Sequence, residues 1–148
     1  MDRERIAAKI REMDSYLNKL KAFAPPKLEN YLGDEKTKHA CERLLQISIE
    51  TAIEIASEIS KGLKIEIPAD EEDMFEKLKK KRVISERLAD KLKEMKGFRN
   101  ILVHRYGEVN DRLVFAFIEN DLSDFEDLKK EILFFLKQRT FHRIDTVV

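Results

Sequence analysis

The rarity of residues that break helices constrains the fold of this chain more than any other feature of its sequence. Its 148 residues include four glycines and three prolines. Between these few interruptions the apolar residues recur three and four positions apart, which is the spacing of one face of a helix rather than of a strand. The sequence therefore predicts an all-α fold, and a chain of this length can bury roughly 70% of the surface that it exposes when unfolded.

The same spacing predicts a bundle of about five to six helices. The first helix must stop before residues 24–26, which read APP, because the residue before a proline disfavours the helical conformation. Later helices are expected over residues 34–61, 71–80, 86–105 and 111–119, and from about residue 123 onward. The helix at 34–61 has an apolar face too wide for one neighbour, so we expect it at the centre of the bundle. The tail, residues 139–148, shows no clear period.

Several side chains mark the expected helix ends. Asp70 and Ser85 are suitable N-caps, because their side-chain oxygens can accept hydrogen bonds from the first free backbone N–H groups. Ser123 and Glu126 have the spacing of a capping box. Gly107 is suited to end the helix at 86–105 in a left-handed conformation.

Charge and composition exclude several classes of protein. Lys and Arg together number 29, as do Asp and Glu, so the net charge is zero and any basic patch must be local. No apolar run approaches the roughly 20 residues that cross a bilayer, so no membrane association is expected. The single cysteine, Cys41, excludes an intrachain disulfide and fits an intracellular compartment. We expect a cytoplasmic protein in which residues 1–148 form a single domain, with broad apolar faces that favour a homodimer.

The helix expected at 86–105 departs from its own apolar pattern. Its core stripe, followed by steps of four and three, reads Leu88, Leu92, Met95, Arg99, Leu102 and Tyr106. A guanidinium on such a stripe must be paired, lie partly exposed in a cleft, or be very costly to bury. Arg99 is therefore the most informative residue of the chain.

His104 lies five residues after Arg99, which places it about 140° away around an ideal helix. On the face of His104 lie Asn100 and Gly97, and a glycine inside a helix lets another backbone or a ligand approach closely. This face predicts one side of a groove. The alternative interpretation is an ordinary helix C-terminus, where the macrodipole favours cations and Gly107 stops the helix.

The stretch RNILVHRY, residues 99–106, resembles the R-x4-H-x-Y motif of HEPN-domain proteins, and specifically of the HepT-like family. Three further segments extend the similarity. RLLQISIETAIEIASEI resembles the family's long central helix, DEEDMFEKLKKKRVISERLADKLKEMKGFRN resembles the segment that leads into the motif, and NDLSDFEDLKKEI resembles its last helix. The resemblance covers most of the chain from about Cys41 to Leu136, in the expected order.

This resemblance implies a HEPN-type helical bundle that acts as the ribonuclease toxin of a toxin and antitoxin pair. The implied partner is an MntA-type minimal nucleotidyltransferase, and the implied enzyme is a metal-independent endoribonuclease. Such enzymes work as homodimers in which the motif helices of two subunits meet at a cleft. Tyr106 matches the motif tyrosine that the partner modifies with AMP to silence the toxin. No cofactor and no metal are expected.

The chemistry of metal-free RNA cleavage can be matched to these residues separately. The reaction needs a base for the ribose 2′-hydroxyl, an acid for the leaving 5′-oxygen, and positive donors for the phosphate. The imidazole of His104 can serve as acid or base near neutrality, and Arg99 offers a planar charged fork for phosphate oxygens. Asn100 could orient either residue through a hydrogen bond. The expected product is a 2′,3′-cyclic phosphate.

Two other functions stay open. One is a non-catalytic HEPN module that docks a nucleotidyltransferase or a nucleotide, with Arg99 bound to an AMP phosphate. The other is a purely structural helical dimer.

Three further features have simpler explanations than a function. The basic run at 77–82 could contact RNA phosphates, but a solvated helix face explains it equally well. His39 and His142 show no ligand spacing with Cys41, so no zinc site is predicted. Glu50 and Glu54 lie one helical turn apart and are interpreted as surface or network charges.

Overall fold

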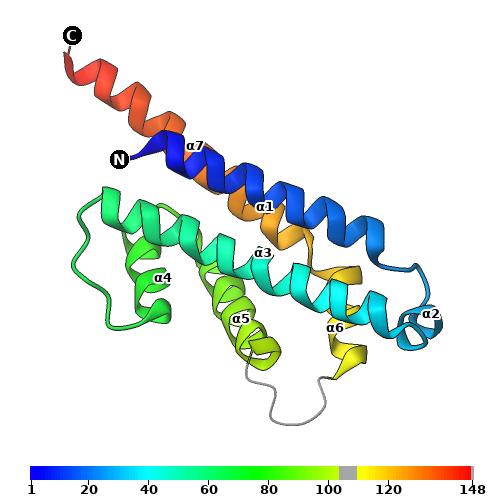
Figure 1. Cartoon of the computed structure of the whole chain (residues 1–148). Coiled ribbons are helices and arrows are strands. Elements are labelled where there is room, and N and C mark those ends of the chain that lie inside the picture. Colours follow the sequence, from blue (N-terminus) through cyan, green and yellow to red (C-terminus); the bar gives the residue numbers. More distant parts are fainter. Residues whose placement is uncertain (104–109, 148) are drawn as a thin grey trace.

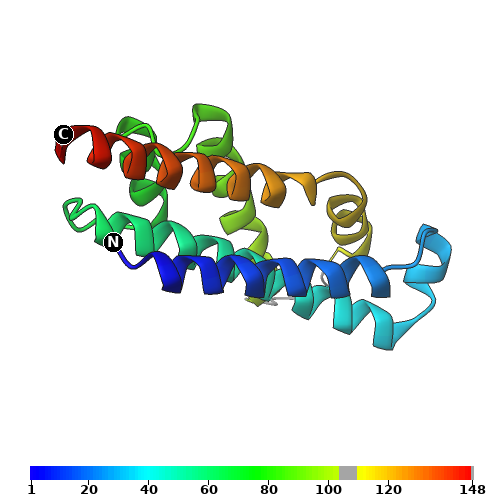
Figure 2. The same ribbon diagram turned by 90° about the horizontal axis from the view of Figure 1, so that it is seen from above.

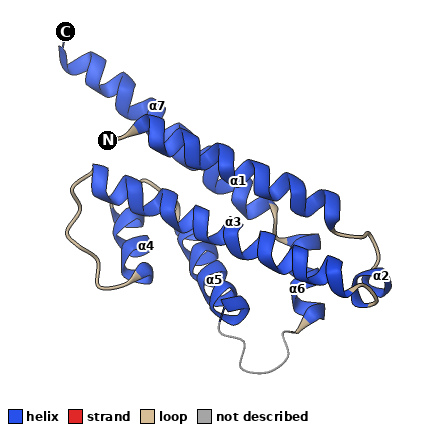
Figure 3. Cartoon of the chain, viewed as in Figure 1, coloured by secondary structure: helices blue, strands red, loops and turns tan. Residues whose placement is uncertain are grey.

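A computed structural model of the chain describes residues 1–103 and 110–147, with side chains for residues 1–103 and 110–139. The described residues contain helices and no strand, so the all-α prediction is confirmed (Figure 3). The helices are α1 (Arg3–Phe23), α2 (Leu28–Leu32), α3 (Glu35–Gly62), α4 (Glu71–Lys80), α5 (Glu86–Val103), α6 (Asp111–Asn120) and α7 (Ser123–Val147).

Helix α3 lies at the centre of the bundle, as its wide apolar face predicts. It packs against α1, α2, α4 and α5. Helices α1 and α3 form a long antiparallel pair joined at one end by α2, while α4 and α5 lie on the side of α3 away from α1 (Figure 1). Helix α7 returns along α1, which is clearest from above (Figure 2). An ion pair of 2.7 Å between Lys129 Nζ and Asp14 Oδ2 joins α7 to α1.

One contiguous cluster of buried apolar side chains contains residues from every helix from α1 to α7. The first helix contributes the residues that its four-three spacing marks, namely Ile6, Ile10, Met13, Leu17 and Leu20. Burying these stripes is what holds the helices together, since short helices are marginal in water by themselves.

The cap predictions at α4 and α5 are confirmed. The Asp70 carboxylate accepts a hydrogen bond from the backbone N–H of Asp73 at 2.7 Å, and α4 begins at the next residue. The Ser85 hydroxyl accepts one from the backbone N–H of Leu88 at 3.1 Å, at the start of α5. Helix α7 begins at Ser123 itself, one residue earlier than the capping box implies. The helix stop predicted at Gly107 lies outside the described residues.

Helix α2 is absent from the sequence prediction, and α7 is longer than predicted. The ring of Tyr31 in α2 is fully buried and lies 5.5 Å from the ring of Phe115, so packing rather than local propensity forms this short helix. Helix α7 continues to Val147 because residues 123–148 include no glycine or proline that would end it. None of the described helices combines the length and the apolar character that a membrane span requires.

Candidate functional site

The core stripe of α5 has the departure that its sequence predicts. Leu88, Leu92, Met95 and Leu102 are all buried, and Arg99 occupies the gap between the last two. The Arg99 side chain keeps 18% of its surface exposed. The stripe is therefore continuous except at one cation, which lies at the edge of the core.

Arg99 is held by two acceptors. Its Nη2 donates to Glu71 Oε1 at 2.6 Å, which makes an ion pair with the first residue of α4. Its Nε donates to Asn100 Oδ1 at 3.1 Å. Of the three options that the sequence leaves for this guanidinium, pairing is the one that the structure adopts. The structure also brings Asn100 into contact with Arg99.

The face of α5 around Gly97 is open. A Cβ built on Gly97 would meet no atom within 4 Å, and Ile101, one turn later on the same face, is 53% exposed. This helix face is uncovered and presents an isoleucine side chain beside a glycine. Another backbone could therefore approach α5 closely here.

The second half of the motif lies outside the described residues. His104 and Tyr106 follow Val103, where α5 ends, and precede Asn110, which caps α6 by accepting a hydrogen bond from the backbone N–H of Leu113 at 3.2 Å. The described part of the motif, residues 99–103, therefore lies at the end of α5.

Arg99 is one of three cations that α5 directs at carboxylates of α4. Lys93 Nζ lies 2.5 Å from Glu76 Oε1, Lys96 Nζ lies 3.4 Å from Glu72 Oε1, and Arg99 Nη2 lies 2.6 Å from Glu71 Oε1. We call these three ion pairs the α4–α5 ladder. The residue numbers fall along α4 as they rise along α5, which is the register of two antiparallel helices.

One carboxylate of the ladder, Glu76, also pairs with a second lysine, Lys79 of its own helix. Hydrogen bonds from Lys79 and Lys93 lower the pKa of Glu76 to about 2, so this carboxylate stays charged well into the acid range. The sequence alone predicts no role for the acidic residues of α4. The sequence shows that α4 is acidic and that α5 carries cations. It does not show the register in which the two helices meet, and this register decides which residues pair.

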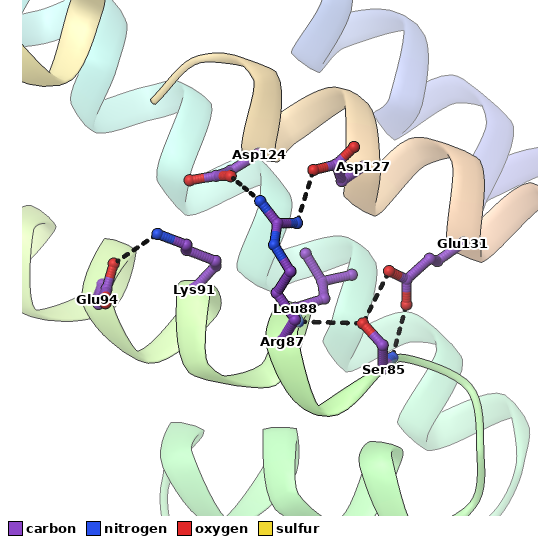
Figure 4. Close-up of polar contacts among 8 residues, drawn as sticks. All are labelled: Ser85, Arg87, Leu88, Lys91, Glu94, Asp124, Asp127 and Glu131. Atoms are coloured by element: carbon purple, nitrogen blue, oxygen red, sulfur yellow. Dashed lines mark hydrogen bonds and ion pairs between the residues drawn. The ribbon is translucent and has the colours of Figure 1, made fainter. Parts of the chain in front are cut away.

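The beginning of α5 is tied to α7 by a second polar cluster (Figure 4). Glu131 accepts hydrogen bonds from the backbone N–H of Ser85 at 2.6 Å and from its hydroxyl at 2.9 Å. Arg87 donates to Asp127 at 2.9 Å and lies 3.5 Å from Asp124, whose pKa is raised by burial. These contacts fix the start of α5 about 20 Å from Arg99, given a rise of roughly 1.5 Å per residue.

The end of α5 is fixed by aromatic packing. The Phe98 ring lies 4.9 Å from the ring of Phe117 in α6, which in turn meets the edge of Phe125 in α7 at 6.5 Å. Because Phe98 directly precedes Arg99, this stack and the ion pair between Glu71 and Arg99 hold the beginning of the motif from two sides.

The other candidate residues have structural surroundings. Cys41 is buried, and burial raises the pKa of its thiol to about 11, so it is a core residue rather than a nucleophile. Glu54 pairs with Lys9 at 2.7 Å and Glu50 accepts from Gln46, which confirms that both carboxylates are network charges.

The described residues of the basic run and His39 form no further candidate site. In the run, Lys77 and Lys79 pair with Asp73 and Glu76 of their own helix. His39 is exposed on α3, and His142 lies among the residues without described side chains. Among the described side chains, no group of three His, Cys, Asp or Glu could hold a metal ion.

The chain is similar to a characterised family of nucleases. A family model described as Ribonuclease HepT-like matches residues 13–132. An mRNA nuclease HepT from Shewanella oneidensis is 39% identical over 82 residues, which cover 55% of this chain and 62% of that protein. A tRNA nuclease HepT from Aphanizomenon flos-aquae is 30% identical over 120 residues, which cover 81% of this chain and 82% of that protein.

Solved structures share the fold. The tri-AMPylated Shewanella oneidensis HEPN toxin, solved in complex with an MNT antitoxin, superposes with a TM-score of 0.79 at 29% identity. The alignment covers 86% of this chain and 95% of the toxin. A toxin-antitoxin structure with AMP-PNP also gives a TM-score of 0.79, at 28% identity and over 86% of this chain and 96% of that one.

Proposed function

Because this chain belongs to the HepT-like ribonuclease family, we propose that it is the endoribonuclease toxin of a toxin-antitoxin pair. The observation that carries this proposal is Arg99, a paired guanidinium at the edge of the core stripe in the last turn of α5, at the first position of the family motif. We place the activity in the cytoplasm, where its RNA substrate would be, and assign it to residues 1–148 as one domain.

The proposed reaction needs no metal. The ribose 2′-oxygen attacks the adjacent phosphorus while a base removes the 2′-hydroxyl proton, and the bond from phosphorus to the 5′-oxygen breaks as an acid protonates that oxygen. The products are a 2′,3′-cyclic phosphate and a free 5′-hydroxyl. His104 supplies the proton transfer, Arg99 stabilises the charge that develops on the phosphate oxygens, and Asn100 orients Arg99.

The site is proposed to form between two copies of the chain. The open surface at Gly97 and the exposed side chain of Ile101 support this arrangement, because they leave the motif end of α5 uncovered within one protomer. A homodimer that covers this face would place the Arg99 of one protomer near the His104 of the other. The antiparallel or crossing contact of two such helices is isologous, as expected for a two-fold dimer.

The proposed partner is an MntA-type minimal nucleotidyltransferase that silences the toxin by attaching AMP to Tyr106. Support comes from the solved relatives, in which a tri-AMPylated toxin is bound to such an antitoxin. Of the three tyrosines in this chain, Tyr31 is fully buried and Tyr16 lies partly buried on α1.

Nuclease activity is tested by incubating the purified protein with total RNA in EDTA, beside the variants Arg99→Ala and His104→Ala. We expect the wild type to cut RNA, and each variant to be slower by about 100-fold or more, since loss of a charged transition-state donor (Arg99) or of a proton-transfer group (His104) costs a factor of this order. Cleavage that is lost in EDTA would contradict the metal-free mechanism. A wild type that cuts no better than the variants would leave the binding module as the better reading.

The modification is tested by intact-mass measurement after incubation with the nucleotidyltransferase and ATP. We expect the wild type and Tyr16→Phe to gain the mass of one or more AMP groups, and Tyr106→Phe to gain none. Tyr16→Phe is the matched control because it removes one phenol hydroxyl from α1, far from the motif in the sequence. AMP addition to Tyr106→Phe would assign the modification to another residue.

A further inference from the structure

Glu71 is the residue that sets the orientation of Arg99 from outside the motif. It is the first residue of α4, and it lies 28 positions before Arg99 in the sequence. Its Oε1 accepts from Arg99 Nη2 at 2.6 Å, and both side chains are largely shielded, with 32% and 18% of their surfaces exposed. A charge-assisted hydrogen bond with this geometry restricts a side chain that otherwise has many rotamers.

The two acceptors on Arg99 occupy the same edge of its guanidinium. Asn100 takes the Nε hydrogen and Glu71 takes an Nη2 hydrogen, and these two hydrogens lie side by side on the planar fork. No described residue bonds to Nη1, and one of its two hydrogens lies on the end-on edge, beside a hydrogen of Nη2. The guanidinium is thus held by one edge, while the other keeps the paired donors that suit two oxygens of a phosphate.

Glu71 differs from the other carboxylates of the α4–α5 ladder. Its Oε2 is buried and makes no hydrogen bond to any described residue. A buried acceptor without a partner lowers stability, and such exceptions to the rules of packing tend to occur at functional sites. Glu72 and Glu76 pair with lysines of α5 that lie outside the motif, whereas Glu71 pairs with its arginine.

We propose that Glu71 is a positioning residue of the nuclease, which holds Arg99 so that the free edge of its guanidinium faces the scissile phosphate. The inference rests on the proposed ribonuclease function and adds to it a residue from a different helix. Glu71 does not touch the RNA in this account. Its effect passes through Arg99 and is therefore exerted on the transition state, where charge accumulates on the phosphate oxygens.

The test is steady-state cleavage of one fluorescent RNA by the full-length wild type and by Glu71→Gln, Glu72→Gln, Arg99→Ala and the double variant Glu71→Gln/Arg99→Ala. Glu72→Gln is the matched control, because it removes the same charge from the next residue of α4 and breaks the neighbouring ion pair of the ladder. We expect Glu71→Gln to lower kcat by about 10-fold to 100-fold with little change in KM, the pattern of a misplaced transition-state group. Glu72→Gln should keep the wild-type kcat.

The double variant shows whether Glu71 acts through Arg99. We expect it to be as slow as Arg99→Ala and no slower, because a positioning residue has nothing left to position. Equal kcat values for Glu71→Gln, Glu72→Gln and wild type would overturn the inference, and so would a double variant slower than Arg99→Ala. If the wild type itself cuts no RNA, the proposed function fails and this inference fails with it, which is distinct from a wild type that cuts and a Glu71→Gln variant that cuts equally well.

Discussion

Mixing the two inactive variants Arg99→Ala and His104→Ala is expected to restore RNA cleavage. If each site combines Arg99 of one protomer with His104 of the other, a mixed dimer retains one intact arginine and one intact histidine that can meet. Random exchange of subunits yields about half mixed dimers, and only one of the two sites in each mixed dimer is intact, so activity should recover to at most about a quarter of the wild-type level. Against variants slowed by about 100-fold or more, this is a large signal.

The measurement is the cleavage rate of a fluorescent RNA before and after the two variants are partly unfolded together and refolded. The control is the same treatment of each variant alone, which should produce no active dimer. A mixture that stays as inactive as its components would show that Arg99 and His104 act within one protomer. The proposal that the site forms between two protomers would then be wrong, although the proposed nuclease reaction would still hold.

Phe125→Ala is expected to cause the largest loss of stability among the aromatic residues near the site. Phe125 is fully buried at the start of α7, and its ring meets the ring of Phe117, which stacks on Phe98 beside Arg99. Removing a fully buried phenylalanine leaves a cavity and costs about 3–5 kcal/mol in the free energy of unfolding. That is a large part of the roughly 5–15 kcal/mol that stabilises a typical domain.

The matched control is Phe134→Ala, which makes the same change on the same helix at a side chain that is 62% exposed. It should alter the free energy of unfolding by no more than about 0.5 kcal/mol. Both variants are measured by urea denaturation at one protein concentration, since a dimer makes stability depend on concentration. Equal unfolding midpoints for the two variants would show that the aromatic stack does not support the core.

The helices and their caps could be predicted from the local sequence, because both depend on residues only three or four positions apart in the chain. The four-three spacing of Ile6, Ile10 and Met13 marks a buried stripe, and Asp70 and Ser85 bond to the backbone N–H of residues three positions later. Helix α2 was missed because Tyr31 becomes buried through Phe115, which lies far away in the sequence. A five-residue helix has too few turns to show a period.

The sequence by itself determined that α5 carries a cation where its core stripe requires an apolar residue. The stripe is defined by the spacing of apolar residues within a single helix, so no other part of the chain is needed to see it. The sequence also supplied the motif, since residues 99–106 are contiguous. Only the tertiary structure decided what holds Arg99. The choice of Glu71 over Glu72 or Glu76 depends on the register in which α4 meets α5, and the packing of both helices on α3 sets that register. Contacts between helices depend on side chains distant in the sequence, so no local pattern could have identified Glu71.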